Sequence, residues 1–386
     1  MKAGSWPSII LIYLFSVCAG GAIGKIIPLV GVLAQALHVG PDRAAWLISA
    51  VLPASVVLAP FGGALSDRLG DRRLTAIGLA VMIAANGAQW LATGYGALLA
   101  ARLVEGGGFV CLTLGPAAMM MRSTQGARQV AAMSLMSTAL PLGVGLSLAL
   151  AGQAPGARWQ LVPLAHGLVL AALLPLLRLA PAGSGAPAPG TPPPLRWTEL
   201  LRAPAPRRLA AGVLSASAIM FGLGALYPTY AVAHFGIAPA TAAAYGLVTY
   251  PASVIGSFMA GALARRHGLG RLGTGGLVAL ALAGVAVFWP ALGLVPSVLL
   301  LVGFYLLAGL VGAVGMARLP AVVPSPAAVG ITTGLYIQGA NAGTMLGAPL
   351  LFAAYYGGAF PAVALAILAC VALTLACWRF PAPSHR

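Results

Sequence analysis

Three charged residues lie well inside long apolar stretches of the chain, where their types suit anion binding or proton transfer. They are Lys25, Arg102 and Glu105. A charge at the centre of a bilayer costs about 2.5–3.5 kcal/mol even on insertion scales, so a residue of this kind is a candidate for function. Arg102 and Glu105 are three residues apart and therefore share one face of a helix. We expect the three side chains to form one cluster.

Two roles are open for this cluster. In the first, Lys25 and Arg102 attract an anionic group of a bound solute. In the second, Glu105 gains and loses a proton, and it is the natural candidate because the chain has only five acidic residues and the other four lie outside the apolar runs. The structural alternative is a static, neutralised cluster that only ties helices together.

The elements that must position these residues are membrane-spanning helices. A spanning helix needs about 20 predominantly apolar residues, and a composition of 60% hydrophobic and 7% charged residues is far from that of a soluble domain. We count about twelve apolar runs of this length. They cover residues 8–37, 43–66, 73–94, 96–121, 128–153, 159–180, 209–233, 240–264, 271–293, 296–318, 327–356 and 359–380.

Basic residues concentrate in alternate breaks between these runs, and the opposite breaks contain only Arg43 and Arg158. By the positive-inside rule, both termini are expected in the cytoplasm and the cluster in the outer half of the membrane. The net charge of +16 is then a topology signal, and we expect no nucleic-acid partner. The first run exceeds the 7–15 apolar residues of a signal peptide, so we expect it to be retained. Tryptophans near the run ends are expected at the membrane interfaces, namely Trp6, Trp46, Trp90, Trp159, Trp289 and Trp378.

The runs divide into two halves around a stretch rich in Pro, Ala and Gly. We predict a six-helix bundle over 1–178, a cytoplasmic linker over 179–208 and a second bundle over 209–386. Within the linker, Trp197–Arg202 is expected to be either a short amphipathic helix or ordered loop. The segments Gly63–Arg73 and Gly261–Arg271 echo each other after the second run of each half, as in transporters built from repeated bundles.

The segment Gly63–Arg73 resembles the loop signature of the major facilitator superfamily, Gly-x-x-x-Asp-Arg-x-Gly-Arg-Arg/Lys. The matching positions are Gly63, Asp67, Arg68, Gly70 and Arg72. The segment Arg102–Gly108 looks like the second signature, an Arg followed by spaced glycines. Asp71 departs from the pattern, since an Arg is usual there. The fifth run lacks the Gly-Pro-x-x-Gly-Gly signature associated with antiporters, which weakens the argument for export by antiport.

The resemblance implies an all-α membrane protein with 12 transmembrane helices in two pseudo-symmetric six-helix bundles. It also implies secondary active transport by alternating access, in which the loop signature gates the inner side and Asp67 latches it. Lys25 stands where drug exporters of the superfamily often carry an acidic residue, which favours a neutral or anionic substrate.

Uncharged polar residues of the second half complete the predicted substrate-binding set of Lys25, Arg102, Gln338, Asn341, Tyr227 and Tyr230. The two amides must find partners in lipid, either substrate or another helix. The two tyrosines either contact substrate or anchor the chain at the interface. His166 and His234 are more readily explained as satisfied, uncoupled histidines.

The sequence therefore predicts a secondary transporter of a small neutral or anionic organic solute, and not an enzyme. We expect coupling to protons or another ion, a slight preference for export, and no cofactor or metal. The expected form is a monomer in the inner (cytoplasmic) membrane of a bacterium. Two alternatives stay open: a proton-linked uptake permease for a metabolite or metal chelate, and a non-transporting sensor or scaffold of the same fold.

Overall fold

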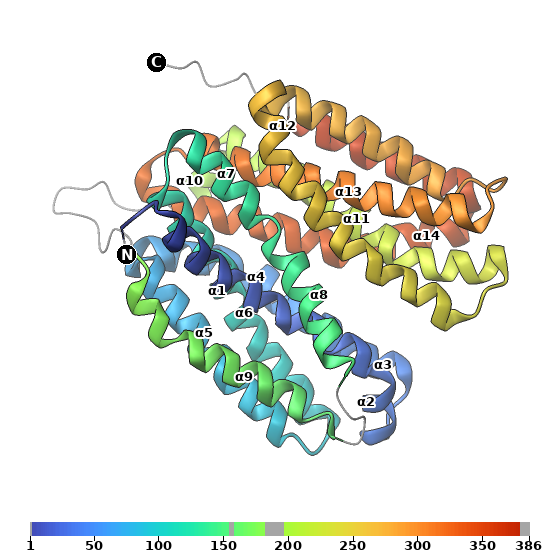
Figure 1. Cartoon of the computed structure of the whole chain (residues 1–386), viewed down its shortest axis with the longest axis horizontal. Coiled ribbons are helices and arrows are strands. Elements are labelled where there is room, and N and C mark those ends of the chain that lie inside the picture. The colour runs from blue at the N-terminus through green and yellow to red at the C-terminus, as the bar shows by residue number, and fades with distance from the viewer. Residues whose placement is uncertain (1, 154–157, 182–196, 379–386) are drawn as a thin grey trace. The chain divides into compact units, whose positions relative to one another are not determined.

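A computed structural model describes residues 2–153, 158–181 and 197–378, and these residues fold almost entirely into helices (Figure 1). The described part of the chain contains no strand. Residues 182–196 of the predicted linker lie outside it, and the linker residues Trp197–Arg202 form the short helix α10. The all-helical class expected from the sequence is confirmed.

Ten described segments are long and apolar enough to cross a membrane. The two longest each contain two helices joined at a kink, at Gly268 in one and at Gly358–Ala359 in the other. Dividing each of them at its kink gives the twelve spans expected from the sequence.

The helices of the first half follow the predicted runs closely, although several runs are interrupted. They are α1 (Trp6–Gly24), η1 (Ile27–Leu29), α2 (Val30–Ala36), α3 (Pro41–Ser49), α4 (Val51–Leu69), α5 (Asp71–Leu91), α6 (Tyr95–Ser123), α7 (Gly126–Met136), α8 (Ala139–Ala151), α9 (Leu161–Leu173) and η3 (Pro175–Leu179). The rest of the chain forms α10, α11 (Pro204–Phe235), α12 (Pro239–Val287), α13 (Leu294–Arg318), η4 (Leu319–Val322), η5 (Pro326–Ala328) and α14 (Val329–Trp378).

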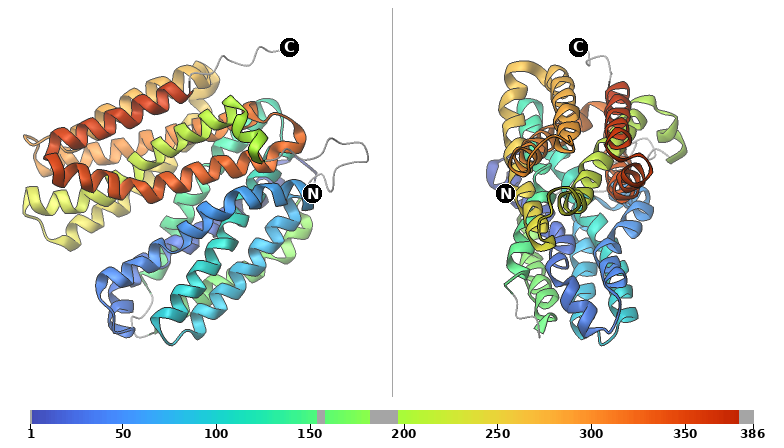
Figure 2. Two further views of the ribbon diagram at one scale, coloured as in Figure 1. Left: turned by 180° about the vertical axis from the view of Figure 1, so that it is seen from behind. Right: turned by 90° about the vertical axis from the view of Figure 1, so that its right-hand side faces the viewer.

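Contacts between residues group the chain into two units, each a bundle of long helices that lie alongside one another (Figure 2). The first consists of Met1–Ala132, Ala139–Leu200 and Val323–Gln338; the second consists of Met133–Thr138, Leu201–Val322 and Gly339–Arg386. In the first unit α1 packs against α6 and α8, while α5 packs against α6 and α9. In the second unit α12 packs against α11 and α13. The division into domains 1–178 and 209–386 stays a prediction.

Large apolar side chains are exposed along the helices, as expected where helices contact lipid. Leu282 and Leu365, for example, are 67% and 69% exposed. Trp6, Trp46, Trp90 and Trp289 are exposed, whereas Trp159 and Trp378 are only 4% and 5% exposed. The predicted interfacial positions of the tryptophans stay a prediction. Trp159 is buried in an apolar cluster with Ile26 and Leu29, and the ring of Trp378 lies 5.3 Å from the Arg318 guanidinium carbon.

Two helix interruptions in the first unit position functional groups. Helix α1 ends at Gly24, because Pro28 has no N–H to donate to the Gly24 carbonyl, and Lys25 becomes the C-cap. A second interruption at Ala50 separates α3 from α4. The last carbonyls of a helix lack partners within it, so the end of α3 offers acceptors to other side chains.

Candidate functional site

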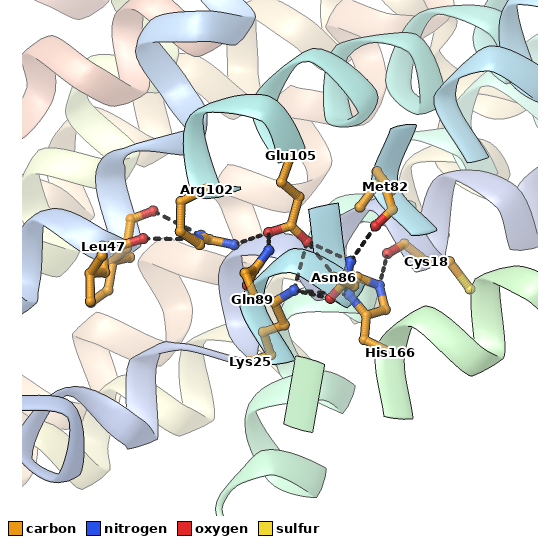
Figure 3. Close-up of polar contacts among 10 residues, drawn as sticks. Cys18, Lys25, Leu47, Met82, Asn86, Gln89, Arg102, Glu105 and His166 are labelled. Atoms are coloured by element: carbon orange, nitrogen blue, oxygen red, sulfur yellow. Dashed lines mark hydrogen bonds and ion pairs between the residues drawn. The ribbon is translucent and has the colours of Figure 1, made fainter. Parts of the chain in front are cut away.

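The structure brings Lys25, Arg102 and Glu105 together in the first unit (Figure 3). Lys25 Nζ lies 2.6 Å from Glu105 Oε1, and Arg102 Nη1 pairs with Glu105 Oε2 from one helical turn away. The three side chains are 2%, 0% and 0% exposed for lysine, arginine and glutamate. The expected cluster therefore exists, with Lys25 at the end of α1 and the other two residues on α6, and its role stays a prediction.

The Glu105 carboxylate accepts four hydrogen bonds. Its Oε1 accepts from Lys25 and, at 3.1 Å, from Asn86 Nδ2. Its Oε2 accepts from Arg102 and, at 2.7 Å, from Gln89 Nε2. An ionised carboxylate has about four acceptor sites, so Glu105 is fully satisfied as an anion.

Lys25 has three donors, and each one faces an acceptor. Besides Glu105 it donates to Asn86 Oδ1, and its Nζ lies 3.4 Å from His166 Nδ1. His166 Nε2 lies 3.0 Å from the Cys18 carbonyl oxygen. A carbonyl only accepts, so we assign the proton to Nε2 and leave Nδ1 as the acceptor for Lys25. In this assignment His166 is neutral and satisfied, as expected, and it also contacts the cluster through Lys25. Whether it takes part in coupling stays a prediction.

Arg102 links the cluster to the end of α3. Its Nε donates to the Leu47 carbonyl at 2.8 Å, and its Nη2 lies 3.5 Å from the Ile48 carbonyl. A cation is favourable at a helix C-terminus, where unpaired carbonyls carry partial negative charge. With two cations, one carboxylate and a neutral histidine, the cluster has a net charge of +1.

Two partners of the cluster, Asn86 and Gln89, were not singled out from the sequence. Both are completely buried on α5, and Asn86 Nδ2 also donates to the Met82 carbonyl at 2.8 Å. The signal was present, because two amides three residues apart within an apolar run share a helix face and must find partners. We refer to Lys25, Asn86, Gln89, Arg102, Glu105 and His166 as the ionic network.

Buried apolar side chains lie next to one side of this network. A buried cluster contains Ile26, Leu29, Leu33 and Leu47. Ile26 directly follows Lys25, and Leu47 provides the carbonyl that accepts from Arg102. The exclusion of water strengthens the hydrogen bonds inside and raises the cost of leaving any member unpaired.

The predicted gating signature forms a second site, around Asp67. The Asp67 carboxylate accepts from the backbone amides of Gly330 and Ile331 at 2.7 and 2.8 Å, and it pairs with Arg122 Nη2 at 2.6 Å. The two amides belong to the first turn of α14, within the part of that helix that groups with the first unit. A carboxylate at this position satisfies free amides and complements the helix dipole.

Asp71, the departure from the family signature, belongs to the same site. It pairs with Arg122 Nη1 at 2.5 Å and accepts from Ser66 Oγ at 2.5 Å. Arg122, one of the basic residues in the breaks between the apolar runs, thus binds both aspartates. Among the signature positions, Gly63 is required because a Cβ there would lie 2.5 Å from the Gly330 carbonyl, and Gly70 has a φ of 88°. Arg68 is exposed and Arg72 is half-buried.

The remaining predicted residues lie in separate surroundings. Gln338, in the first unit, donates to the Val56 carbonyl at 3.1 Å. Asn341 is buried in the second unit, where the Tyr227 hydroxyl lies 3.3 Å from Ser297 Oγ. The Tyr230 ring lies 5.0 Å from both the His234 and the Phe288 rings. Substrate contact by these four residues remains a prediction.

Comparisons with known proteins identify the family. The family model of the Major Facilitator Superfamily matches residues 9–324. No curated protein sequence matches the chain. The crystal structure of the human organic anion transporter MFSD10 (TETRAN) is 17% identical with a TM-score of 0.74, over 96% of this chain and 100% of that chain. The crystal structure of FucP, a Major Facilitator Superfamily transporter in the outward conformation, is 17% identical with a TM-score of 0.75, over 97% and 98%.

At this level of identity the two structures establish the fold alone, whereas the family model covers well over half of the chain. The apolar helices provide the membrane segments that such a transporter needs. The chain therefore belongs to the major facilitator superfamily and is a multi-pass membrane protein, a secondary transporter and not an enzyme.

Proposed function

We propose that the chain moves a small neutral or anionic organic solute across the membrane by alternating access, coupled to protons. The observation that carries this proposal is the buried ionic network, in which two cations share one carboxylate. Taking charges out of water costs several kcal/mol per ion, and a single neutral pair would link the helices more cheaply. The excess positive charge favours a partner that brings negative charge.

Glu105 is the proposed proton-coupling residue. All its acceptor sites are occupied, so a proton added to the carboxylate displaces one of its donors. Protonation also removes the negative charge that holds Lys25 and Arg102 together. Uptake of one proton would thus loosen contacts among α1, α5 and α6, which is the kind of local change that can bias a two-state element.

Lys25 and Arg102 are the proposed anion-attracting residues. Lys25 is the better candidate for direct contact, because its hydrogen bond to His166 is long at 3.4 Å. Arg102 is anchored by the end of α3 and holds Glu105 in place. The name of MFSD10, an organic anion transporter, agrees with this substrate class. We further propose that Gln338, Asn341, Tyr227 and Tyr230 contact the uncharged part of the solute.

The Asp67 site is the proposed inner gate. Asp67 binds the first turn of α14 while Arg122 ties it to Asp71, so breaking these contacts releases the start of α14. We also propose export as the direction, with protons as the coupling ion. The proposed setting is a monomer in a bacterial cytoplasmic membrane. The distribution of basic residues supports the placement of both termini inside.

Transport in proteoliposomes tests the coupling role. Purified protein is reconstituted with a pH-sensitive dye inside, and a panel of small organic acids and neutral solutes is added across a pH series. We expect at least one solute to move with protons, and Glu105→Gln to remove the pH dependence. Glu199→Gln is the matched control because Glu199 is exposed on α10.

Unchanged pH dependence in Glu105→Gln contradicts the role of Glu105. If no solute exchanges in counterflow, the non-transporting sensor or scaffold becomes the better explanation of the same fold.

A further inference from the structure

A cavity of about 460 Å³ lies within the first unit between α1, α8 and α9. Helices α8 and α9 follow one another in the chain. Helix α8 packs closely against α1, and α9 contacts α1 over a much smaller region (Figure 1). Among the described residues α8 and α9 make almost no contact with each other, so the cavity opens between them. Its size is within the range of about 300–1,000 Å³ that is typical of small-molecule sites.

The open side of this cavity is apolar. It is bordered by Leu146 and Leu150 from α8 and by Leu161 and Val169 from α9, which are 50%, 74%, 43% and 51% exposed. Apolar side chains exposed on spanning helices form a surface compatible with the hydrocarbon core of a bilayer. A ligand with an apolar body therefore gains favourable contacts in this opening.

The closed end of the cavity is polar, because Lys25 and His166 line it. Gly21 also lines it, and a Cβ there would lie 2.7 Å from His166 Nε2, so the glycine allows the ring to approach α1. Ser147 adds a hydroxyl, which donates to the Val144 carbonyl at 3.0 Å. The longest contact of Lys25, 3.4 Å to His166 Nδ1, is made at this end.

We propose that this cavity binds an amphipathic organic carboxylate that enters from the bilayer between α8 and α9. Its carboxylate would replace His166 as the third acceptor of Lys25, and its chain would lie along Leu146, Leu150 and Val169. The charge argument is direct: the ionic network has a net charge of +1, and of its charged members Lys25 lines the cavity. The proposal rests on the transporter function above and assigns the substrate class to this site.

Binding of radiolabelled decanoate to the full-length protein tests the proposal, in nanodiscs made only of phosphatidylcholine. We expect saturable binding that unlabelled decanoate displaces and that decyltrimethylammonium displaces at least about tenfold less effectively. Val169→Trp fills the cavity opening and should weaken decanoate binding by about tenfold or more. Leu168→Trp is the matched control, because Leu168 is the neighbouring exposed residue on α9 and does not line the cavity.

The proposal would be overturned if decanoate bound equally well to Val169→Trp and to the wild type. It would also be overturned if decyltrimethylammonium displaced labelled decanoate as effectively as unlabelled decanoate does. Lys25→Gln should abolish decanoate binding. Because this substitution removes a buried partner of Glu105, Val169→Trp provides the test if the Lys25→Gln variant does not fold. The two proposals fail separately. If Val169→Trp binds decanoate as the wild type does while transport by Glu105→Gln has lost its pH dependence, only the cavity proposal is wrong. If Val169→Trp loses decanoate binding while transport by Glu105→Gln keeps its pH dependence, only the coupling role of Glu105 is wrong.

Discussion

Neutralising Glu105 and neutralising Lys25 should have very different effects on stability, although each change removes one buried charge. The wild-type network holds two cations and one carboxylate. Glu105→Gln leaves Lys25 and Arg102 as two buried cations without a counter-ion. Lys25→Met leaves Arg102 and Glu105 as a balanced pair. The double variant, Lys25→Met with Glu105→Gln, leaves Arg102 as the one cation.

The magnitudes follow from the contacts. Removing the shared partner of a buried ion pair costs about 3–5 kcal/mol, so we expect this loss of unfolding free energy for Glu105→Gln. Lys25→Met removes hydrogen bonds to Asn86, His166 and Glu105. Because Glu105 keeps Arg102 as its counter-ion and the amides of Asn86 and Gln89 as donors, the main loss is the unpaired acceptors of Asn86 and His166, at a cost of about 1–3 kcal/mol. The double variant should be more stable than Glu105→Gln, because the second substitution removes the repulsion between the two cations.

Equilibrium unfolding in bicelles, followed by intrinsic tryptophan fluorescence, measures these differences. The four proteins form a double-mutant cycle, which isolates the Lys25–Glu105 coupling from the separate effects of each substitution. Glu199→Gln is the control and should change the free energy of unfolding by less than about 0.5 kcal/mol, because Glu199 is exposed.

Two results would refute the reasoning. If Lys25→Met destabilises the protein as much as Glu105→Gln, charge balance does not govern the network. If the double variant is no more stable than Glu105→Gln alone, the two cations do not repel each other in the folded protein.

Two further predictions concern packing and gating. Arg122→Met leaves the buried Asp67 and Asp71 without their shared cation and should lower the unfolding free energy by about 3–5 kcal/mol, while Arg73→Met at an exposed position should have little effect. Gly143→Ala should cost about 1–3 kcal/mol by overpacking, because its Cβ would clash with the Val17 carbonyl oxygen where α8 meets α1. The control Gly87→Ala adds a methyl group to open space. Equal losses of unfolding free energy in Gly143→Ala and Gly87→Ala would contradict the packing explanation, and equal losses in Arg122→Met and Arg73→Met would contradict the charge explanation.

Much of the architecture was predictable because it depends on local composition. Spans are recognised by length and hydropathy, and their number agrees with the structure once α12 and α14 are divided at their kinks. The three buried charges stood out for the same reason, since a charge within an apolar run is costly wherever its partners are. Arg102 and Glu105 were also a predictable pair, because their spacing alone places them on one helix face.

Partners from distant parts of the chain were not predictable in this way. Asn86 and His166 reach Lys25 only because α5 and α9 present these residues to α1, and Arg122 reaches Asp67 and Asp71 from the far end of α6. An apolar helix surface gives little indication of which face meets which neighbour, since packing with small residues such as Gly21 decides it.

The sequence by itself determined that a few charges would lie within a helical membrane protein of this superfamily. The tertiary structure alone decided that two cations share one carboxylate and that Lys25 reaches a cavity between α8 and α9. The physical reason is that burial cost can be read from each residue and its neighbours in the chain, whereas pairing and cavities depend on how whole helices pack.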